Sequence, residues 1–122
     1  LTRTRRSARQ AGATFERTIA DALAGALDDD RIDRRVKRGT KDRGDIAGLR
    51  IHGQRVVVEV KNCAKMDLPG WTREAQLEAG NDDALVGVVI HKRHGNGQGL
   101  DQWVTLTVAD FVSLLTGQKV VR

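Results

Sequence analysis

The sequence has few of the residues that usually cross-link or anchor a small protein. Its 122 residues include one cysteine, one proline, two tryptophans, two phenylalanines and no tyrosine. The single Cys63 excludes an intrachain disulfide, and no Cys/His group has the spacing of a zinc site. No apolar run approaches the roughly 20 residues that span a bilayer, and no apolar stretch follows the basic amino end as it would in a signal peptide. We therefore expect one reduced, cytoplasmic domain over residues 1–122, without a membrane partner.

Positive charge, by contrast, is abundant and unevenly placed. The net charge is +5, yet residues 1–9 carry +4 and residues 31–43 carry +5, so the rest of the chain carries −4. A basic zone on a mildly acidic body is typical of proteins that bind a phosphate backbone, although a solubilising charge pattern is the alternative. The scarcity of aromatic residues counts against single-strand binding by base stacking. We expect these residues to contact nucleic acid: Arg3, Arg5, Arg6 and Arg9 in a basic amino-terminal arm, and Arg34, Arg35, Lys37, Arg38, Lys41 and Arg43.

Hydrophobic periodicity predicts an α/β domain with the order αβββαββα around a mixed sheet. Apolar side chains recur every four residues over 7–27, which is typical of an amphipathic helix, with Ser7 as its N-cap. A second helix is expected over 71–79, after a break at 68–70. The expected strands are residues 32–38, 45–51, 55–62, 84–91 and 102–107.

A last helix is expected after Thr107, which is a suitable N-cap. Phe111, Leu114 and Leu115 then form its buried side.

Two acids and a lysine are the residues most suggestive of chemistry. Glu59 and Lys61 are two apart in a valine-rich strand, so their side chains share a face. If residues 52–54 form a three-residue loop, Asp45 becomes a diagonal neighbour of Glu59, with Cα atoms about 7–8 Å apart; a two-residue loop would turn Asp45 to the opposite face. Two convergent carboxylates suit Mg²⁺ or Mn²⁺, and a nearby lysine can stabilise charge on a reacting phosphate. The alternative is an exposed strand face with an Asp45–Lys61 salt bridge.

The run Gly44-Asp45-Ile46, followed thirteen residues later by Glu59-Val60-Lys61, resembles the motif of the PD-(D/E)XK nuclease superfamily, with Gly44 in the place of proline. The resemblance implies the restriction-endonuclease-like αβββαβ core, a mixed central sheet flanked by helices. It also implies that Asp45, Glu59 and the carbonyl of Val60 bind the metal and that Lys61 is the catalytic lysine. The small size, the basic character and an acid on the leading helix are most similar to archaeal and phage Holliday junction resolvases. That similarity implies that Glu16 completes the site, and in some branches of the superfamily a polar residue placed like Gln76 faces it.

Together these features predict a Mg²⁺-dependent (or Mn²⁺-dependent) endodeoxyribonuclease, most similar to a Holliday junction resolvase acting on four-way DNA as a homodimer. The alternatives are another nuclease of the same superfamily, for repair, restriction or end processing, and a non-catalytic nucleic-acid-binding module.

Overall fold

A computed structural model describes residues 3–37 and 39–121 of the chain. The elements follow one another as α1 (Arg5–Leu27), β1 (Asp33–Arg34), β2 (Ile46–Ala47), β3 (Arg50–Ile51), β4 (Gln54–Lys61), α2 (Leu68–Asn81), β5 (Val86–His91), the 3₁₀ turn η1 (Gly99–Asp101), β6 (Trp103–Thr105) and α3 (Val108–Thr116). The predicted α/β class and mixed sheet are confirmed.

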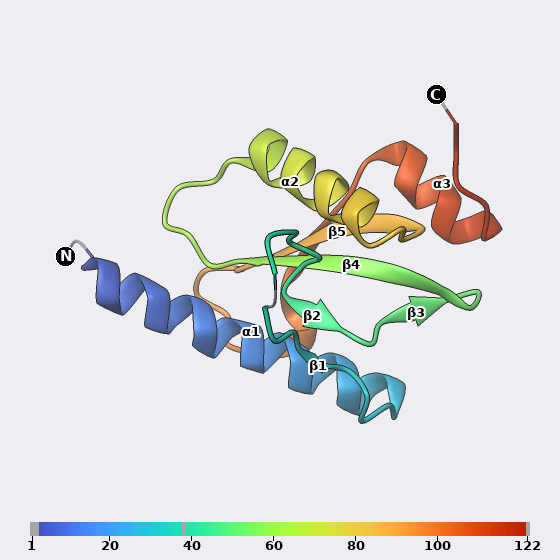
Figure 1. Ribbon diagram of the computed structural model, residues 1–122. Coiled ribbons are helices and arrows are strands. Elements are labelled where there is room, and N and C mark those ends of the chain that lie inside the picture. Colours follow the sequence, from blue (N-terminus) through green and yellow to red (C-terminus); the bar gives the residue numbers. More distant parts are fainter. Residues whose placement is uncertain (1–2, 38, 122) are drawn as a thin grey trace.

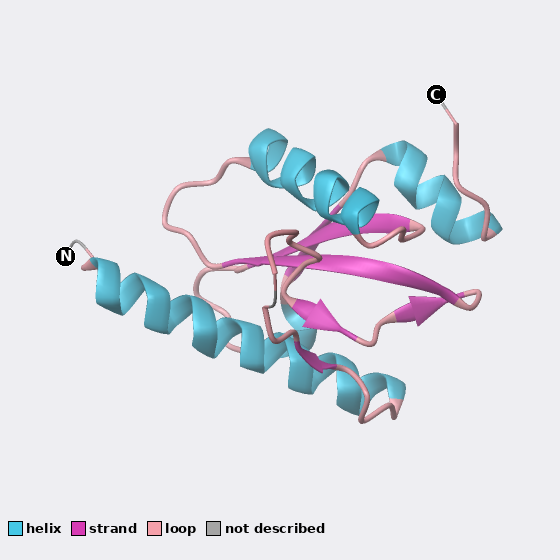
Figure 2. Ribbon diagram, in the orientation of Figure 1, coloured by secondary structure: helices cyan, strands magenta, loops and turns pink. Residues whose placement is uncertain are grey.

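The sheet has the order β1-β2-β4-β5-β6, with β3 paired only to β4 (Figure 1). β4 and β5 run parallel, and the other pairs are antiparallel. Every residue of β5 is buried, as expected of a central strand with both faces covered. Helix α1 lies against one face of the sheet and α2 against the other (Figure 2).

Alternation along β4 divides the core between these two helices. Val58 and Val60 belong to the cluster that includes Phe15 and Ile19 of α1. Val57 packs instead against residues at the end of α2. Because side chains alternate in a strand, Glu59 and Lys61 lie on the α2 face, where they contact that helix.

The turn between β3 and β4 differs from the prediction. It has two residues rather than three, since Ile51 pairs directly with Gln54. His52 and Gly53 occupy it, both with positive φ (51° and 73°), as a tight hairpin turn requires. On its own, this register would turn Asp45 away from the α2 face.

An extra residue between β2 and β3 shifts the pairing with β4 by one further residue. Gly48 has a φ of 89°, and a Cβ there would collide with the carbonyl oxygen of Arg31, two residues before β1. Beyond this bulge the pairing shifts to Ile46 with Val58. Asp45 itself precedes β2, where its N–H donates to the Val58 carbonyl at 2.8 Å, so the predicted diagonal pairing of Asp45 with Glu59 is not formed.

The helix ends also correct the predictions. α1 begins at Arg5 with Thr4 as its N-cap, because the Thr4 hydroxyl accepts the Ser7 N–H, so Ser7 is inside the helix. Residues 68–70, expected to break the chain, form the first turn of α2, where Pro69 gives up no intrahelical hydrogen bond.

Thr107 caps α3 as predicted, with its hydroxyl accepting the Asp110 N–H. The buried side of α3 is different from the prediction. Leu114 packs against the core, whereas Phe111 and Leu115 are 51% and 68% exposed. Among the residues that the structure describes, no helix combines the length and apolar character needed to cross a membrane.

Candidate metal centre

Four carboxylates from three segments converge on the α2 side of β4. They can offer ligand atoms that all lie within 4.8 Å of one another. Glu74 and Glu78 are four residues apart and therefore lie on one face of α2. The cluster consists of Asp42, Glu59, Glu74 and Glu78.

Two of these acids are almost fully buried. Glu59 is 4% exposed and Glu78 is 2% exposed, and in each the Oε2 atom has no hydrogen-bond partner among the described residues. Buried carboxylates this close together are costly unless they share a proton or hold a cation. The cluster is therefore chemically suited to a hard divalent cation, which prefers carboxylate oxygens.

The protonation of the cluster follows from its burial. Burial raises the pKa of Glu59, and a hydrogen bond from Glu78 opposes part of this rise, so that the pKa is about 7. Burial raises the pKa of Glu78 to about 10, reinforced by the hydrogen bond and the charge of Glu59. Burial alone would raise the pKa of Asp42, but the Gly44 N–H at 2.9 Å and the Glu78 proton lower it. A proton on Glu78 thus holds the metal-free cluster together at neutral pH, and a bound cation would displace it.

Lys61 lies at the edge of the cluster. Its Nζ is 3.2 Å from Glu59 Oε1 and 2.9 Å from Glu74 Oε2. Burial alone would lower the pKa of Lys61, but the hydrogen bond to Glu74 and the charge of Glu59 raise it. Lys61 is therefore a hydrogen-bond donor and a positive charge at neutral pH, not a base.

Asp45 is buried beside this cluster but is not one of its four members. Its Oδ2 accepts the Val60 N–H at 2.8 Å, and its Oδ1 is 3.2 Å from Lys37 Nζ. Burial alone would lower the pKa of Lys37, but the charge of Asp45 raises it. The predicted role of Val60 used its carbonyl; in the structure its N–H orients Asp45. The charge of Asp45 contributes to the raised pKa of Glu59, so the two carboxylates are electrostatic neighbours.

Glu16 does not reach the cluster. It extends from α1 to Arg34, whose Nε is 3.5 Å from Glu16 Oε1. Burial raises the pKa of Glu16, and the charge of Asp45 raises it further. Glu16 thus belongs to the electrostatic surroundings of Asp45 without contacting Glu59.

Gln76 does not reach it either. Its amide donates to Thr107 Oγ1 at 3.4 Å, and it lines a separate cavity of about 200 Å³ with Gly87 and Asp110. At about 100° per residue, Gln76 is turned some 200° from Glu74 on the same helix.

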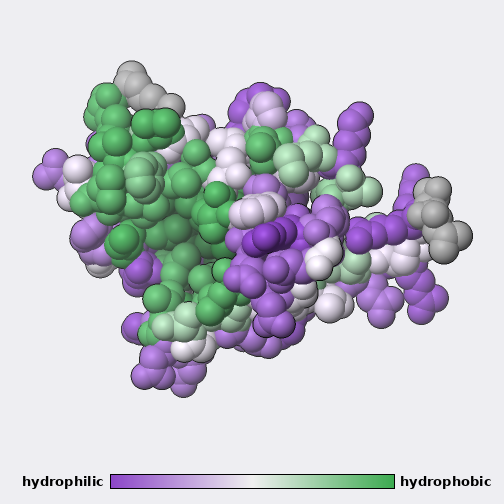
Figure 3. Space-filling model, turned by 180° about the vertical axis from the view of Figure 1, so that it is seen from behind, coloured by the Kyte–Doolittle hydropathy of each residue, from purple (hydrophilic) through white to green (hydrophobic). Residues whose placement is uncertain are grey.

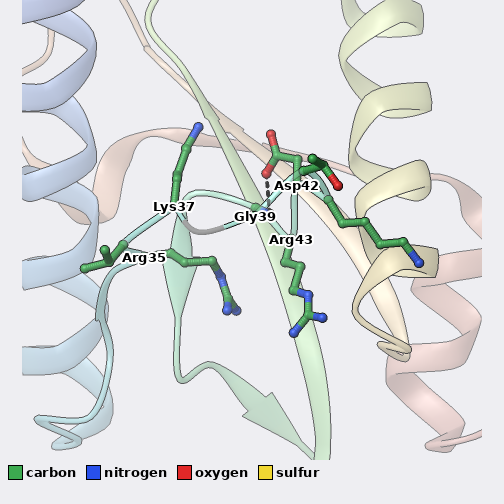
Figure 4. Close-up of a pocket in the computed structure, with 9 residues that line it drawn as sticks. Arg35, Lys37, Gly39, Asp42 and Arg43 are labelled. Carbon is green, nitrogen blue, oxygen red and sulfur yellow. Dashed lines mark hydrogen bonds between the residues drawn. The ribbon is translucent and has the colours of Figure 1, made fainter.

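The segment between β1 and β2 forms a basic loop beside the acids. Lys37 and Asp42 point toward one end of this loop, whereas Arg35 and Arg43 point toward the other (Figure 4). Asp82, at the end of α2, anchors the loop, because its carboxylate lies 3.8 Å from Arg35 and 4.0 Å from Arg43. The loop borders a hollow of about 640 Å³, which is lined by Arg35, Val36, Lys37, Gly39, Thr40, Lys41, Asp42, Arg43 and Gly44.

The basic arm has a different setting. Arg5, Arg6 and Arg9 lie exposed on the first turns of α1. Arg3 donates to the Asn62 carbonyl at 3.0 Å, just beyond β4. Arg38 lies outside the described residues.

The predicted site did not include Asp42, Glu74 or Glu78. The spacing of Glu74 and Glu78 was the available signal, since the predicted helix over 71–79 already placed them on one face. Asp42 had no such signal, because its position depends on tertiary contacts: the side chain of Asn81 donates to its carbonyl at 2.9 Å.

Comparisons with protein-family models, with curated proteins and with solved structures found no match to this chain. The function is therefore inferred from the site itself.

Proposed function

We propose that this protein is a metal-dependent endonuclease of the PD-(D/E)XK type, which hydrolyses phosphodiester bonds in DNA. One observation carries the proposal: the buried Glu59 belongs to a cluster of four carboxylates, and its Oε2 accepts no hydrogen bond from the described residues. Lys61 lies at the edge of this cluster, and the basic loop lies beside it. The alternative, an exposed strand face with a salt bridge, does not explain why a carboxylate is buried, since burial of a carboxylate costs desolvation free energy.

Glu59 is the ligand common to the family motif and to the carboxylate cluster. Asp45 joins it in the motif, whereas Asp42 and Glu78 join it in the cluster. These residues would hold Mg²⁺ or Mn²⁺, since carboxylate oxygens suit both ions. The ion supplies water activation and neutralisation of phosphate charge.

The chain's own residues would then position and stabilise the substrate. Lys61, protonated at neutral pH, donates to a phosphate oxygen as negative charge develops there. Lys37, Lys41 and Arg43 line the hollow beside the acids and would hold the flanking phosphates. Hydrolysis adds the attacking water oxygen to phosphorus and breaks the bond to the leaving sugar oxygen.

The test is cleavage of labelled DNA in Mg²⁺ by matched variants. We expect Glu59→Gln to lower the cleavage rate by at least about 100-fold while DNA binding is retained. The control Asp83→Asn, an exposed acid with positive φ that asparagine tolerates, leaves the rate unchanged. Full activity of Glu59→Gln contradicts the proposal.

The same assay distinguishes the two ligand sets. If the family motif describes the site, Asp45→Asn abolishes cleavage and Glu78→Gln only weakens it. If the cluster describes the site, Glu78→Gln is the more damaging change. Mn²⁺ affinity, measured by calorimetry on both variants, separates lost ligands from lost catalysis.

Within this activity we propose a Holliday junction resolvase that acts as a homodimer, since symmetric cleavage of two strands needs two sites related by a two-fold axis. The resemblance and the basic surface support this substrate. Preferential cleavage of a four-way junction over linear duplex and flap DNA is expected; equal cleavage of all three favours a repair or end-processing nuclease.

A non-catalytic nucleic-acid-binding module is the second candidate, favoured by the ion pairs that neutralise Arg34 and Arg35 in the structure. It predicts DNA binding without any rise in melting temperature on addition of Mn²⁺.

A further inference from the structure

An apolar surface lies at the β6 edge of the sheet, two strands from β4, which carries Glu59. Figure 3, seen from behind the view of Figure 1, shows hydrophobic side chains gathered on this side of the molecule. Val104 of β6 is 57% exposed and Trp103 is 46% exposed. Helix α3 continues the surface.

The outer side of α3 is apolar. Val108, Phe111, Val112 and Leu115 recur at the spacing of one helical stripe, and all four are exposed, Val108 by 79%. Leu114, beside this stripe, packs on the core, and the buried Ser113 and the inward-pointing Asp110 lie on the opposite side of the helix. An apolar stripe that faces solvent, beside a side already packed on the core, is typical of a surface that a partner covers.

This surface also carries almost no charge. From Gln102 to Gln118 the only charged residue is Asp110, in a chain that is 30% charged. The Asp110 carboxylate points inward, where it accepts the Gly87 N–H at 3.3 Å. Covering the α3 stripe therefore desolvates no charged group.

The neighbouring strand is equally open. β6 is the last strand of the sheet order, so its outer edge is unpaired among the described residues. Trp103, Val104 and Thr105 include no lysine or proline, the residues that usually protect an edge. Arg93 covers only the Trp103 ring, at 4.7 Å from its centroid.

We infer that a second copy of this chain covers this surface, with the two α3 stripes packed on each other about a two-fold axis. The exposed side chains of β6 and α3 present on the order of 600 Å², close to the ~800 Å² that each partner buries in a standard interface. A stripe of valine, phenylalanine and leucine is complementary to itself, so a two-fold contact satisfies both copies at once. Two chains of net charge +5 repel each other, and this uncharged face is where they approach at least electrostatic cost.

The placement leaves the rest of the molecule free. The basic loop follows β1, at the opposite end of the sheet order from β6 (Figure 1). Contact through β6 and α3 therefore leaves both basic loops of the dimer uncovered. This surface would be the interface of the homodimer proposed above, but the evidence for it is the apolar edge alone and does not depend on the nuclease activity.

The test is the molar mass of the full chain by sedimentation equilibrium, without metal or DNA. We expect a dimer for the unaltered chain and a dissociation constant raised at least about 100-fold by Leu115→Glu, which places two like charges in the contact. Leu77→Glu is the matched control: Leu77 on α2 is also 68% exposed, and its variant stays dimeric. A monomeric unaltered chain, a dimeric Leu115→Glu or an equal effect of Leu77→Glu overturns the inference.

Hydrogen exchange of the unaltered chain provides a reading that does not depend on the folding of a variant. Dilution through the dissociation range should speed amide exchange in β6 and α3 and leave α2 unchanged. If no segment of β6 or α3 responds to dilution, the contact lies elsewhere and the inference fails. The apolar surface would then bind a different protein.

Discussion

Replacing Glu59 by glutamine should stabilise the metal-free protein at high pH while removing its proposed activity. Burial raises the pKa of Glu59 from 4.5 to about 7. The unfolded chain therefore loses this proton near pH 4.5, whereas the folded chain keeps it until about pH 7. Over that window the folded state binds more protons, so the stability of the protein falls as pH rises.

The size of the effect follows from the shift. One pKa unit corresponds to about 1.4 kcal/mol, so ionised Glu59 costs the folded state about 3 kcal/mol at pH 8. Glutamine has no charge to desolvate. The stability of Glu59→Gln relative to the unaltered chain should therefore rise by about 3 kcal/mol between pH 4.5 and pH 8.

Urea unfolding measures this difference when it is followed by tryptophan fluorescence, which includes the signal of the buried Trp71. Asp33→Asn is a control of opposite sign, because the Arg34 N–H and Arg17 lower the pKa of Asp33. A glutamine variant that is less stable than the unaltered chain at pH 8, or a difference that does not change with pH, would refute the reasoning.

Three further predictions concern the cation, the chain around it and the basic loop. Mn²⁺ should raise the melting temperature more at pH 8 than at pH 6, because binding displaces protons whose loss is easier at high pH; differential scanning fluorimetry checks this, and a pH-independent rise contradicts it. Gly44→Ala should lower the free energy of unfolding by about 2 kcal/mol or more, since Gly44 has a φ of 95° and a Cβ there would lie 2.9 Å from Val57 Cγ1; unchanged urea unfolding would contradict it. Asp82→Asn should remove the buried anion that pairs with Arg35 and Arg43 and so speed amide exchange in residues 35–37 and 39–44. Unchanged exchange would mean that Asp82 does not anchor the loop.

The sequence was sufficient for the elements whose patterns are strong. The long amphipathic repeat of α1, the continuous apolar run of β5 and the Thr107 cap of α3 each carry a local signal, and each is confirmed. The shared face of Glu59 and Lys61 follows from strand alternation alone.

Register and loop placement were beyond local signals. The two-residue turn at Gly53 and the extra residue at Gly48 each shift the pairing of this part of the chain with β4, and together they set Ile46 against Val58. Whether a glycine forms a turn or a bulge depends on the pairing of distant residues.

The acidic cluster combines both cases. Glu74 and Glu78 could have been recognised from their helical spacing, whereas Asp42 is placed by contacts with α2 that no short pattern encodes. The predicted buried side of α3 was wrong for Phe111 and Leu115 because the apolar stripe of this helix faces solvent, and periodicity alone does not tell which side meets the core.

The central claim is that the cluster around Glu59 cuts DNA with the aid of a divalent cation, and one measurement addresses it directly. Purified chain is stripped of metal with EDTA, mixed with a labelled four-way junction and supplied with Mg²⁺, alongside Lys61→Met and the exposed control Lys65→Met. We expect no cleavage in EDTA, cleavage restored by Mg²⁺ in the unaltered chain and in Lys65→Met, and a loss of at least about 100-fold in Lys61→Met. Cleavage that persists in EDTA, or that is unaffected by loss of Lys61, would contradict the account.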